Sequence, residues 1–208
     1  TAIYVYGSSP ATVTMGSANP NLIAYFDADA TISSRVLKVY RKSIKTIVLG
    51  DHADEAEFVD GYNLRIPKAF TADKVSYIRN NAEHWSSVAV PFDVNKITIK
   101  ETGEELHWFR SVADTEGNVM VKSFSGNRGS NMVFKHLDED KMTANTVYLL
   151  GVCGTVEGKH FDNIGKNLVF QGENTKVNAT SEIDTTSKPT KLTLVPCYSD
   201  AKISGVWA

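Results

Sequence analysis

The chain has 208 residues, of which 42% are hydrophobic and 22% are charged, and its formal net charge is −2. This near-neutral charge provides no positive electrostatic field that would attract nucleic acid. No apolar run reaches the roughly 18 residues of a membrane-spanning helix. A chain of this length can bury a full core without a metal or cofactor, so no cofactor is expected. Because it starts directly in strand-like sequence, we expect a mature product or a piece of a longer protein.

Short alternating runs punctuated by turn residues dominate the sequence. Each run has about five residues, is rich in Val, Ile, Tyr and Thr, and most end at Gly, Asn or Asp. The runs recur roughly every 8–12 residues, which is typical of sandwiches and barrels. In chain order, the predicted strands are AIYVYG, ATVTMG, NLIAYF, VLKVY, KTIVLG, NLRIP, KVSYIR, SSVAVPF, KITIKE, NVMVKSF, NMVFKH, TVYLLGV, NLVFQG, KLTLVP and ISGVW.

The pattern predicts an all-β fold with little helix. We expect a β-sandwich with Greek-key or jelly-roll connections, preceded by a small N-terminal strand ladder. Residues 1–57 are predicted to form the short-strand segment and residues 58–208 the sandwich, with a single domain as the alternative. The segment DHADEAEFV contains helix-forming residues, but Asp60 and Gly61 limit any helix there to about two turns.

The stretch EHWSSVAVPFDV is the most distinctive in the chain. Its continuous apolar run at 88–90 predicts a strand that is covered on both faces, and Pro91 marks the end of that strand. Trp85 is predicted to anchor a core, and the Asp93 carboxylate is predicted to accept hydrogen bonds from turn amides. A catalytic pair of His84 and Asp93 is the alternative, but an extended segment about 30 Å long would keep them apart.

The segment ELHWFR suggests a ligand-binding surface. In an extended strand, Trp108 and Arg110 share one face, whereas His107 and Phe109 share the other. An exposed aromatic ring can stack on the apolar face of a sugar. Trp108 and Arg110 are therefore the candidate ligand-binding residues, with core packing of Trp108 or Phe109 as the alternative.

Acidic residues in DHADEAE provide a weak candidate for metal binding. Asp51, Asp54 and Glu57 offer hard oxygen ligands that suit calcium, although their spacing does not match a calcium-binding loop. A solvated acidic loop without an ion is the alternative. The five histidines have no tight spacing of metal ligands, so no zinc site is expected.

No catalytic motif is recognisable. No serine lies in a G-x-S-x-G elbow, and no cysteine has a histidine at an informative spacing. No catalytic residues are therefore assigned, and the chain is not expected to be an enzyme. Cys153 and Cys197 either form one disulfide or stay as two free, buried thiols. The loop SGNRGSN predicts a hairpin turn.

Four segments follow one another in an informative order: ANPNLIAYFDADATI, FVDGYNLRIPKAFTADKVSYIRN, HWSSVAVPFDV and MTANTVYLL. Together they resemble a β-rich module of secreted and surface proteins of Bacteroidales gut bacteria, which often follows leucine-rich-repeat or other adhesin-like segments. The resemblance runs from about Asn19 to Tyr148. It is weaker where Val147 replaces the usual proline, and poor after Tyr148.

The resemblance implies an extracellular or cell-surface setting, with anchoring to the outer membrane through a segment absent from this chain. It carries no activity and no catalytic residues. We therefore expect a non-enzymatic module with an adhesive or structural role, whose partners are other surface proteins, glycans or further copies of itself. The alternative is a carbohydrate-binding module that uses exposed aromatics on a β-surface. The sequence DTT at 184–186 also resembles the O-glycosylation context of these bacteria.

Overall fold

A computed structural model describes residues 2–7, 21–30, 32, 44–62, 64–111, 113–114, 116–156, 159–180 and 194–198. All regular secondary structure in these ranges is β-strand, so the predicted all-β class is confirmed. Within the same ranges, no helix has the length and hydrophobicity that a membrane crossing requires. Five of the predicted strands lie wholly or partly outside the described residues, namely ATVTMG, VLKVY, NLRIP, KLTLVP and ISGVW, as does the DTT segment.

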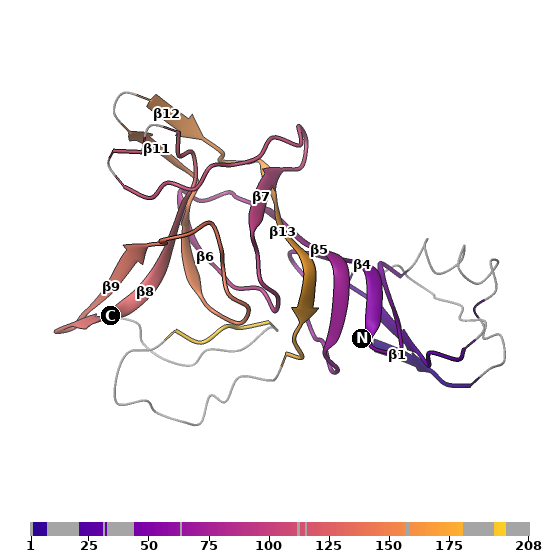
Figure 1. Cartoon of the computed structure of the whole chain (residues 1–208). Helices are drawn as coiled ribbons and strands as arrows, with labels where there is room; N and C mark the ends of the chain where they lie inside the picture. The colour runs from indigo at the N-terminus through magenta and orange to yellow at the C-terminus, as the bar shows by residue number, and fades with distance from the viewer. Residues whose placement is uncertain are drawn as a thin grey trace.

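The described strands form two large sheets and one small hairpin (Figure 1). The seven-stranded sheet has, in spatial order, β1 (Ala2–Val5), β2 (Ile23–Phe26), β3 (Thr46–Leu49), β4 (His52–Val59), β5 (Phe70–Asn80), β13 (Asn167–Val177) and β7 (Lys96–Ile99). The four-stranded sheet has β6 (Trp85–Val88), β10 (Tyr148–Gly151), β8 (Met120–Arg128) and β9 (Asn131–His136). The hairpin consists of β11 (Cys153–Val156) and β12 (Lys159–Asp162).

The seven-stranded sheet mixes parallel and antiparallel pairs. β1–β2, β2–β3 and β4–β5 are parallel, whereas β3–β4, β5–β13 and β13–β7 are antiparallel. β1 to β3 form the predicted ladder of short strands as the outer part of this sheet. β4 spans the predicted boundary at residue 57, and the sheet continues on both sides of it. The division into two domains and the Greek-key or jelly-roll connections stay predictions.

One hydrophobic core lies between the two large sheets, as expected of a sandwich. Phe58 on β4 and Phe170 on β13 enter it from the seven-stranded sheet, and Leu150 on β10 enters it from the four-stranded sheet. Phe92, in the connection that follows β6, is fully buried in the same core. Its ring centroid lies 6.5 Å from that of Phe58. Burying one such side chain contributes about 1.5–3 kcal/mol, so these aromatics are major contributors to sheet packing.

A second, smaller cluster lies on the opposite face of the seven-stranded sheet. Ala24 and Phe26 of β2 pack there with Leu22 and Ile44. The alternate residue Ile23 faces the main core. β2 is therefore buried on both faces, which explains its continuous apolar sequence. Such burial is usual for a strand that, like β2, pairs in parallel on both sides.

β4 corrects the interpretation of DHADEAEFV as a marginal helix or a solvated acidic loop. It is an eight-residue strand that pairs with β5. Ala53 and Phe58 face the core, but Asp54 and Glu55 are both exposed, so the alternation slips by one residue there. The alternation along β5 breaks at the facing position, because Asp73 and Lys74 are both exposed as well. Because the alternation of buried and exposed residues breaks in both strands, the sequence lacks the period of two that normally identifies a strand.

The stretch EHWSSVAVPFDV is only partly a strand. β6 ends at Val88, and Val90 and Phe92 are buried in the irregular segment that follows. Elsewhere, the loop SGNRGSN forms the predicted tight turn between β8 and β9, with Arg128 paired to Asn131. The predicted strand NLRIP is wrong for its described part, because 64–67 has no regular structure.

Candidate functional site

Trp108 and Arg110 do not form a shared exposed face. Residues 105–110 do not form a continuous strand, and Trp108 makes a single isolated bridge to Val119. Trp108 is 5% exposed in the main core, and Phe109 is buried as well. Arg110 is exposed and pairs with Asp140, with 2.9 Å between its guanidinium nitrogen and a carboxylate oxygen. Trp108 and Phe109 are therefore both packed in the interior, as the alternative interpretation predicted, and Trp108 exposes no ring face on which a sugar could stack.

Trp85 is the tryptophan that faces solvent among those described, contrary to its expected place in a core. It is 44% exposed at the start of β6, an edge strand of the four-stranded sheet. The six-membered part of its indole ring lies directly over Gly151, the partner residue on β10. The ammonium group of Lys122 lies 5.8 Å from the ring centroid. The sheet therefore presents an aromatic ring beside a cation on its outer surface.

His84 and Cys153 meet immediately beside Trp85. The imidazole Nδ1 lies 2.6 Å from the Cys153 sulfur, although the two residues are 69 positions apart in sequence. Such separation explains why no spacing motif predicted the pair. Neither Cys153 nor Cys197 forms a disulfide, so the disulfide alternative is wrong; the thiols are separate, but Cys153 is half-buried and Cys197 is exposed rather than buried. In the described part of the chain, no third metal-ligating side chain joins the pair.

Asp93 has the structural role predicted for it. Its Oδ1 accepts a hydrogen bond of 2.9 Å from the backbone N–H of Ala144, and its Oδ2 lies 3.1 Å from the Lys141 ammonium. His84 contacts the Cys153 sulfur instead. The hypothetical His84–Asp93 catalytic pair thus has no support in the contacts of either residue.

The outer strand β1 carries a row of tyrosines. Tyr4 is opposite Tyr25 on β2, and their ring centroids are 4.9 Å apart with planes 9° from parallel. Tyr6 continues the row, 6.3 Å from Tyr4 with an interplanar angle of 10°. Tyr6 is 74% exposed and Tyr4 is 40% exposed, whereas Tyr25 is buried and donates its hydroxyl proton to the Lys68 carbonyl.

The free edge of β1 is unshielded in the described part of the chain, where only β2 pairs with it. The Val5 carbonyl accepts a hydrogen bond from the Asp27 N–H on the β2 side. Because backbone groups alternate along a strand, those of Tyr4 point to the open side, and those of Tyr6, the residue directly after the strand, are expected to do so too. β1 is short, with four residues, but it has no charged residue, proline or bulge, which are three of the features that prevent edge pairing.

The calcium candidates do not converge as predicted. Asp51 lies in the turn before β4, and the Glu57 carboxylate is 2.9 Å from the Lys45 ammonium in an ion pair. Asp54 lies instead near His52 and Asp73, a residue of β5 that sequence spacing could not associate with it.

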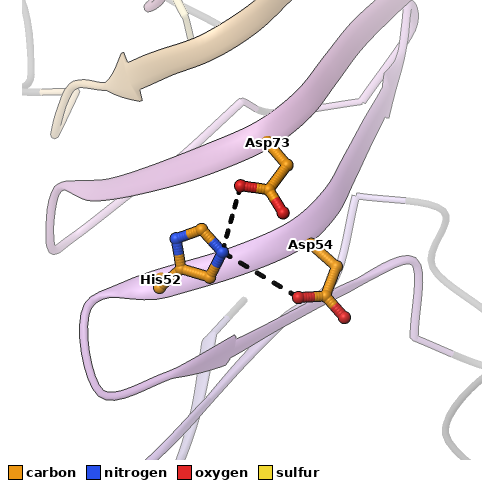
Figure 2. A group of neighbouring side chains, drawn as sticks. All are labelled: His52, Asp54 and Asp73. Atoms are coloured by element: carbon orange, nitrogen blue, oxygen red, sulfur yellow. Dashed lines mark ion pairs between the residues drawn. The ribbon is translucent and has the colours of Figure 1, made fainter.

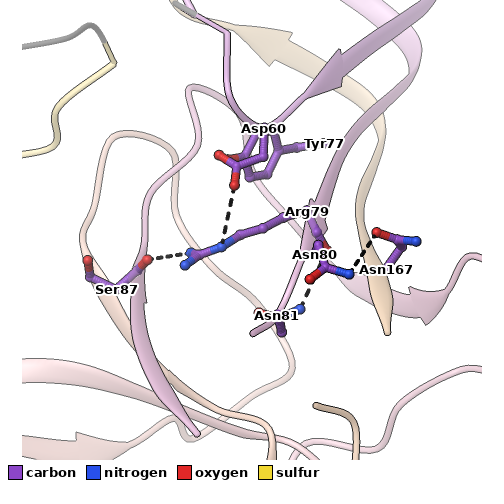
Figure 3. A network of polar contacts seen from close by, with 7 residues as sticks. All are labelled: Asp60, Tyr77, Arg79, Asn80, Asn81, Ser87 and Asn167. Carbon is purple, nitrogen blue, oxygen red and sulfur yellow. Dashed lines mark hydrogen bonds and ion pairs between the residues drawn. The ribbon is translucent and has the colours of Figure 1, made fainter. Parts of the chain in front are cut away.

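A polar network connects the two large sheets at one end (Figure 3). The Tyr77 hydroxyl donates a 2.6 Å hydrogen bond to Asp60 Oδ1, and the Arg79 Nε lies 4.0 Å from Asp60 Oδ2. Arg79 also donates to the carbonyl of Ser87 on β6. Because Tyr77 and Arg79 belong to β5, the network links the seven-stranded sheet to the four-stranded sheet, which is a structural role.

Burial raises the pKa of Tyr77 well above the ordinary value of 10.0, and its hydrogen bond to the Asp60 carboxylate raises it further. The fold therefore favours the protonated phenol. This stabilisation is fully present below pH 10 and is lost as the pH rises from there toward the raised pKa.

We predict that Tyr77→Phe costs about 1 kcal/mol of unfolding free energy at neutral pH and makes the decline in stability above pH 10 shallower. Urea unfolding from pH 7 to 11 checks this; an unchanged alkaline slope would contradict it.

Comparison of the chain with protein-family models, curated proteins and solved structures found no match. The resemblance to the Bacteroidales surface module therefore stays a prediction, as do its implications for setting and role.

Proposed function

We propose that this chain is a non-enzymatic module of a secreted or cell-surface protein with an adhesive or structural role, and that it associates by strand addition at β1. The observation that carries the proposal is the uncharged edge of β1, which displays Tyr4 and Tyr6 and which, among the described strands, pairs with β2 alone. An exposed edge strand offers a ready row of backbone donors and acceptors to another chain. The two tyrosines add apolar contact area with little loss of side-chain entropy.

The experiment that tests the proposal is light scattering of the full chain over a range of concentrations. We expect the average mass to rise with concentration as β1 edges of two copies pair. Tyr6→Pro should weaken this association by at least about tenfold, because it removes an outward backbone N–H while leaving the bonds to β2 in place. The matched variant Tyr6→Ala loses the ring but keeps the N–H, so it should retain more of the association.

Two results would overturn strand addition at β1. One is a mass that does not change with concentration. The other is association of equal strength in wild type, Tyr6→Pro and Tyr6→Ala, which would place the contact elsewhere.

Carbohydrate binding is the second candidate function, and Trp85 is the observation that favours it. Its exposed ring and the neighbouring Lys122 could meet the apolar face and the hydroxyl groups of a sugar. Calorimetric titration with a panel of host and plant glycans tests the idea. A binding glycan should lose about tenfold or more in affinity with Trp85→Ala, and little with the matched change Tyr62→Ala at another exposed aromatic. Binding that survives Trp85→Ala would exclude this surface.

A further inference from the structure

Three metal-ligating side chains lie on one face where β4 and β5 run side by side. His52 is the first residue of β4 and Asp54 follows two positions later, so both side chains point the same way. Asp73 stands on β5, two positions after Thr71, which is the register partner of His52. Figure 2 shows the three side chains turned toward one another across the two strands. Backbone pairing, rather than sequence spacing, brings them together.

The distances between the three groups suit a small cation. His52 Nε2 lies 3.3 Å from Asp73 Oδ1 and 3.9 Å from Asp54 Oδ1. One ligand atom from each residue lies within 4.8 Å of the others. Around a tetrahedral ion with bonds of about 2.0–2.1 Å, ligand atoms are about 3.3 Å apart. Small side-chain rotations would therefore bring all three atoms to bonding distance.

A fourth residue sets the orientation of the imidazole. The Thr71 hydroxyl donates to the Asp51 carbonyl at 3.2 Å, and its oxygen lies 3.3 Å from His52 Nδ1. Because the hydroxyl proton is already engaged, the oxygen can accept the Nδ1–H of His52. In the neutral tautomer with the proton on Nδ1, the lone pair of Nε2 faces the two carboxylates. This is the arrangement in which a second residue holds a histidine ready for a metal.

In this tautomer, one imidazole nitrogen and two carboxylate oxygens face one another with no hydrogen atom between them. A divalent cation would balance the two carboxylate charges and satisfy all three atoms. His52 and Asp54 also line a hollow of about 940 Å³ on this side of the sheet. Space for a further ligand, such as water or a group from a partner, therefore lies next to them.

We propose that His52, Asp54 and Asp73 bind a divalent transition-metal ion of the Zn²⁺ class. One imidazole nitrogen with two carboxylate oxygens suits such an ion, whereas calcium takes six to eight oxygen ligands. The site differs from the set of Asp51, Asp54 and Glu57 that the sequence suggested. It is also separate from the β1 edge and from Trp85, so it can be tested independently of the proposed function.

Calorimetric titration of the full chain with Zn²⁺ at pH 7.5 tests the site. We expect binding that each of His52→Gln, Asp54→Asn and Asp73→Asn weakens by at least about tenfold. All three side chains are exposed, so circular dichroism should show that the variants keep the wild-type fold. In NMR spectra, the His52 Nε2 resonance should shift on addition of Zn²⁺. A hundredfold excess of Ca²⁺ should leave the Zn²⁺ bound.

Two matched variants serve as controls. Asp51→Asn removes a neighbouring carboxylate that is not one of the three proposed ligands. His84→Gln removes the imidazole that contacts the Cys153 thiol. Both variants should bind Zn²⁺ as the wild type does. The proposal is overturned if the chain takes up no Zn²⁺, or if the three ligand variants bind as tightly as the wild type. Weakening by His84→Gln alone, or displacement of Zn²⁺ by Ca²⁺, would overturn it too.

Discussion

Phe92→Ala is expected to lower the free energy of unfolding by about 3–5 kcal/mol, the range found when a large buried aromatic is truncated. Phe92 is fully buried, and its ring lies against Phe58 of the seven-stranded sheet with an interplanar angle of 27°. Its removal would leave a cavity in the core between the sheets, which the surrounding strands can close only partly. Chemical denaturation of the two proteins gives the difference directly.

Tyr62→Ala is the matched control for Phe92→Ala, because Tyr62 is an aromatic residue that is 50% exposed. It should change the free energy of unfolding by no more than about 0.5 kcal/mol. If Phe92→Ala costs no more than Tyr62→Ala, Phe92 is not a core residue and the packing of the two sheets described above is wrong.

Gly172→Ala is expected to cost about 2–3 kcal/mol, although it adds only one methyl group. Gly172 lies in β13 and faces the segment that follows Pro91. A Cβ at this position would overlap the backbone carbonyl oxygen of Asp93, and it would crowd the side chains of Thr175 and Val75. A backbone carbonyl cannot rotate away as a side chain can, so the strand or the segment must move.

Gly154→Ala makes the same change where the space is less confined. Its nearest neighbour would be the edge of the Phe161 ring at 3.3 Å, and neither glycine has a positive φ. Thermal and urea unfolding should therefore show a much smaller loss for Gly154→Ala than for Gly172→Ala. Equal stability of the two variants would contradict the close approach of Asp93 to β13.

The strands that sequence predicts best are those whose apolar residues follow a regular pattern. β1, β2, β3, β7, β9 and β10 lie within predicted runs, because their Val, Ile, Leu and Phe residues recur or are continuous, whereas β8 and β13 begin within a predicted run and extend beyond it. β4 was missed because its acidic residues and alanines favour helix or loop, and because the slip at Asp54 and Glu55 breaks the alternation. Its β structure comes from pairing with β5, which no local pattern encodes.

Candidate sites were harder to predict than strands, because they depend on contacts between distant segments. Composition alone cannot tell that Trp85 lies over a glycine at a sheet edge while Trp108 enters the core. The pairing of His84 with Cys153 crosses 69 residues of sequence. Asp54 is one of the residues that the sequence suggested as a ligand, but the side chains that lie near it, His52 and Asp73, are brought there by the register of β4 against β5.

Hydrogen exchange at β1 tests the central claim of strand addition most directly. The amide hydrogen of Tyr4 points away from β2 and that of Tyr6 is expected to do so, so both should exchange quickly in a dilute sample of the full chain. As concentration rises and the average mass increases, these two amides should become protected in proportion to the associated fraction. Association that leaves both amides exchanging at the dilute rate would contradict pairing at the β1 edge.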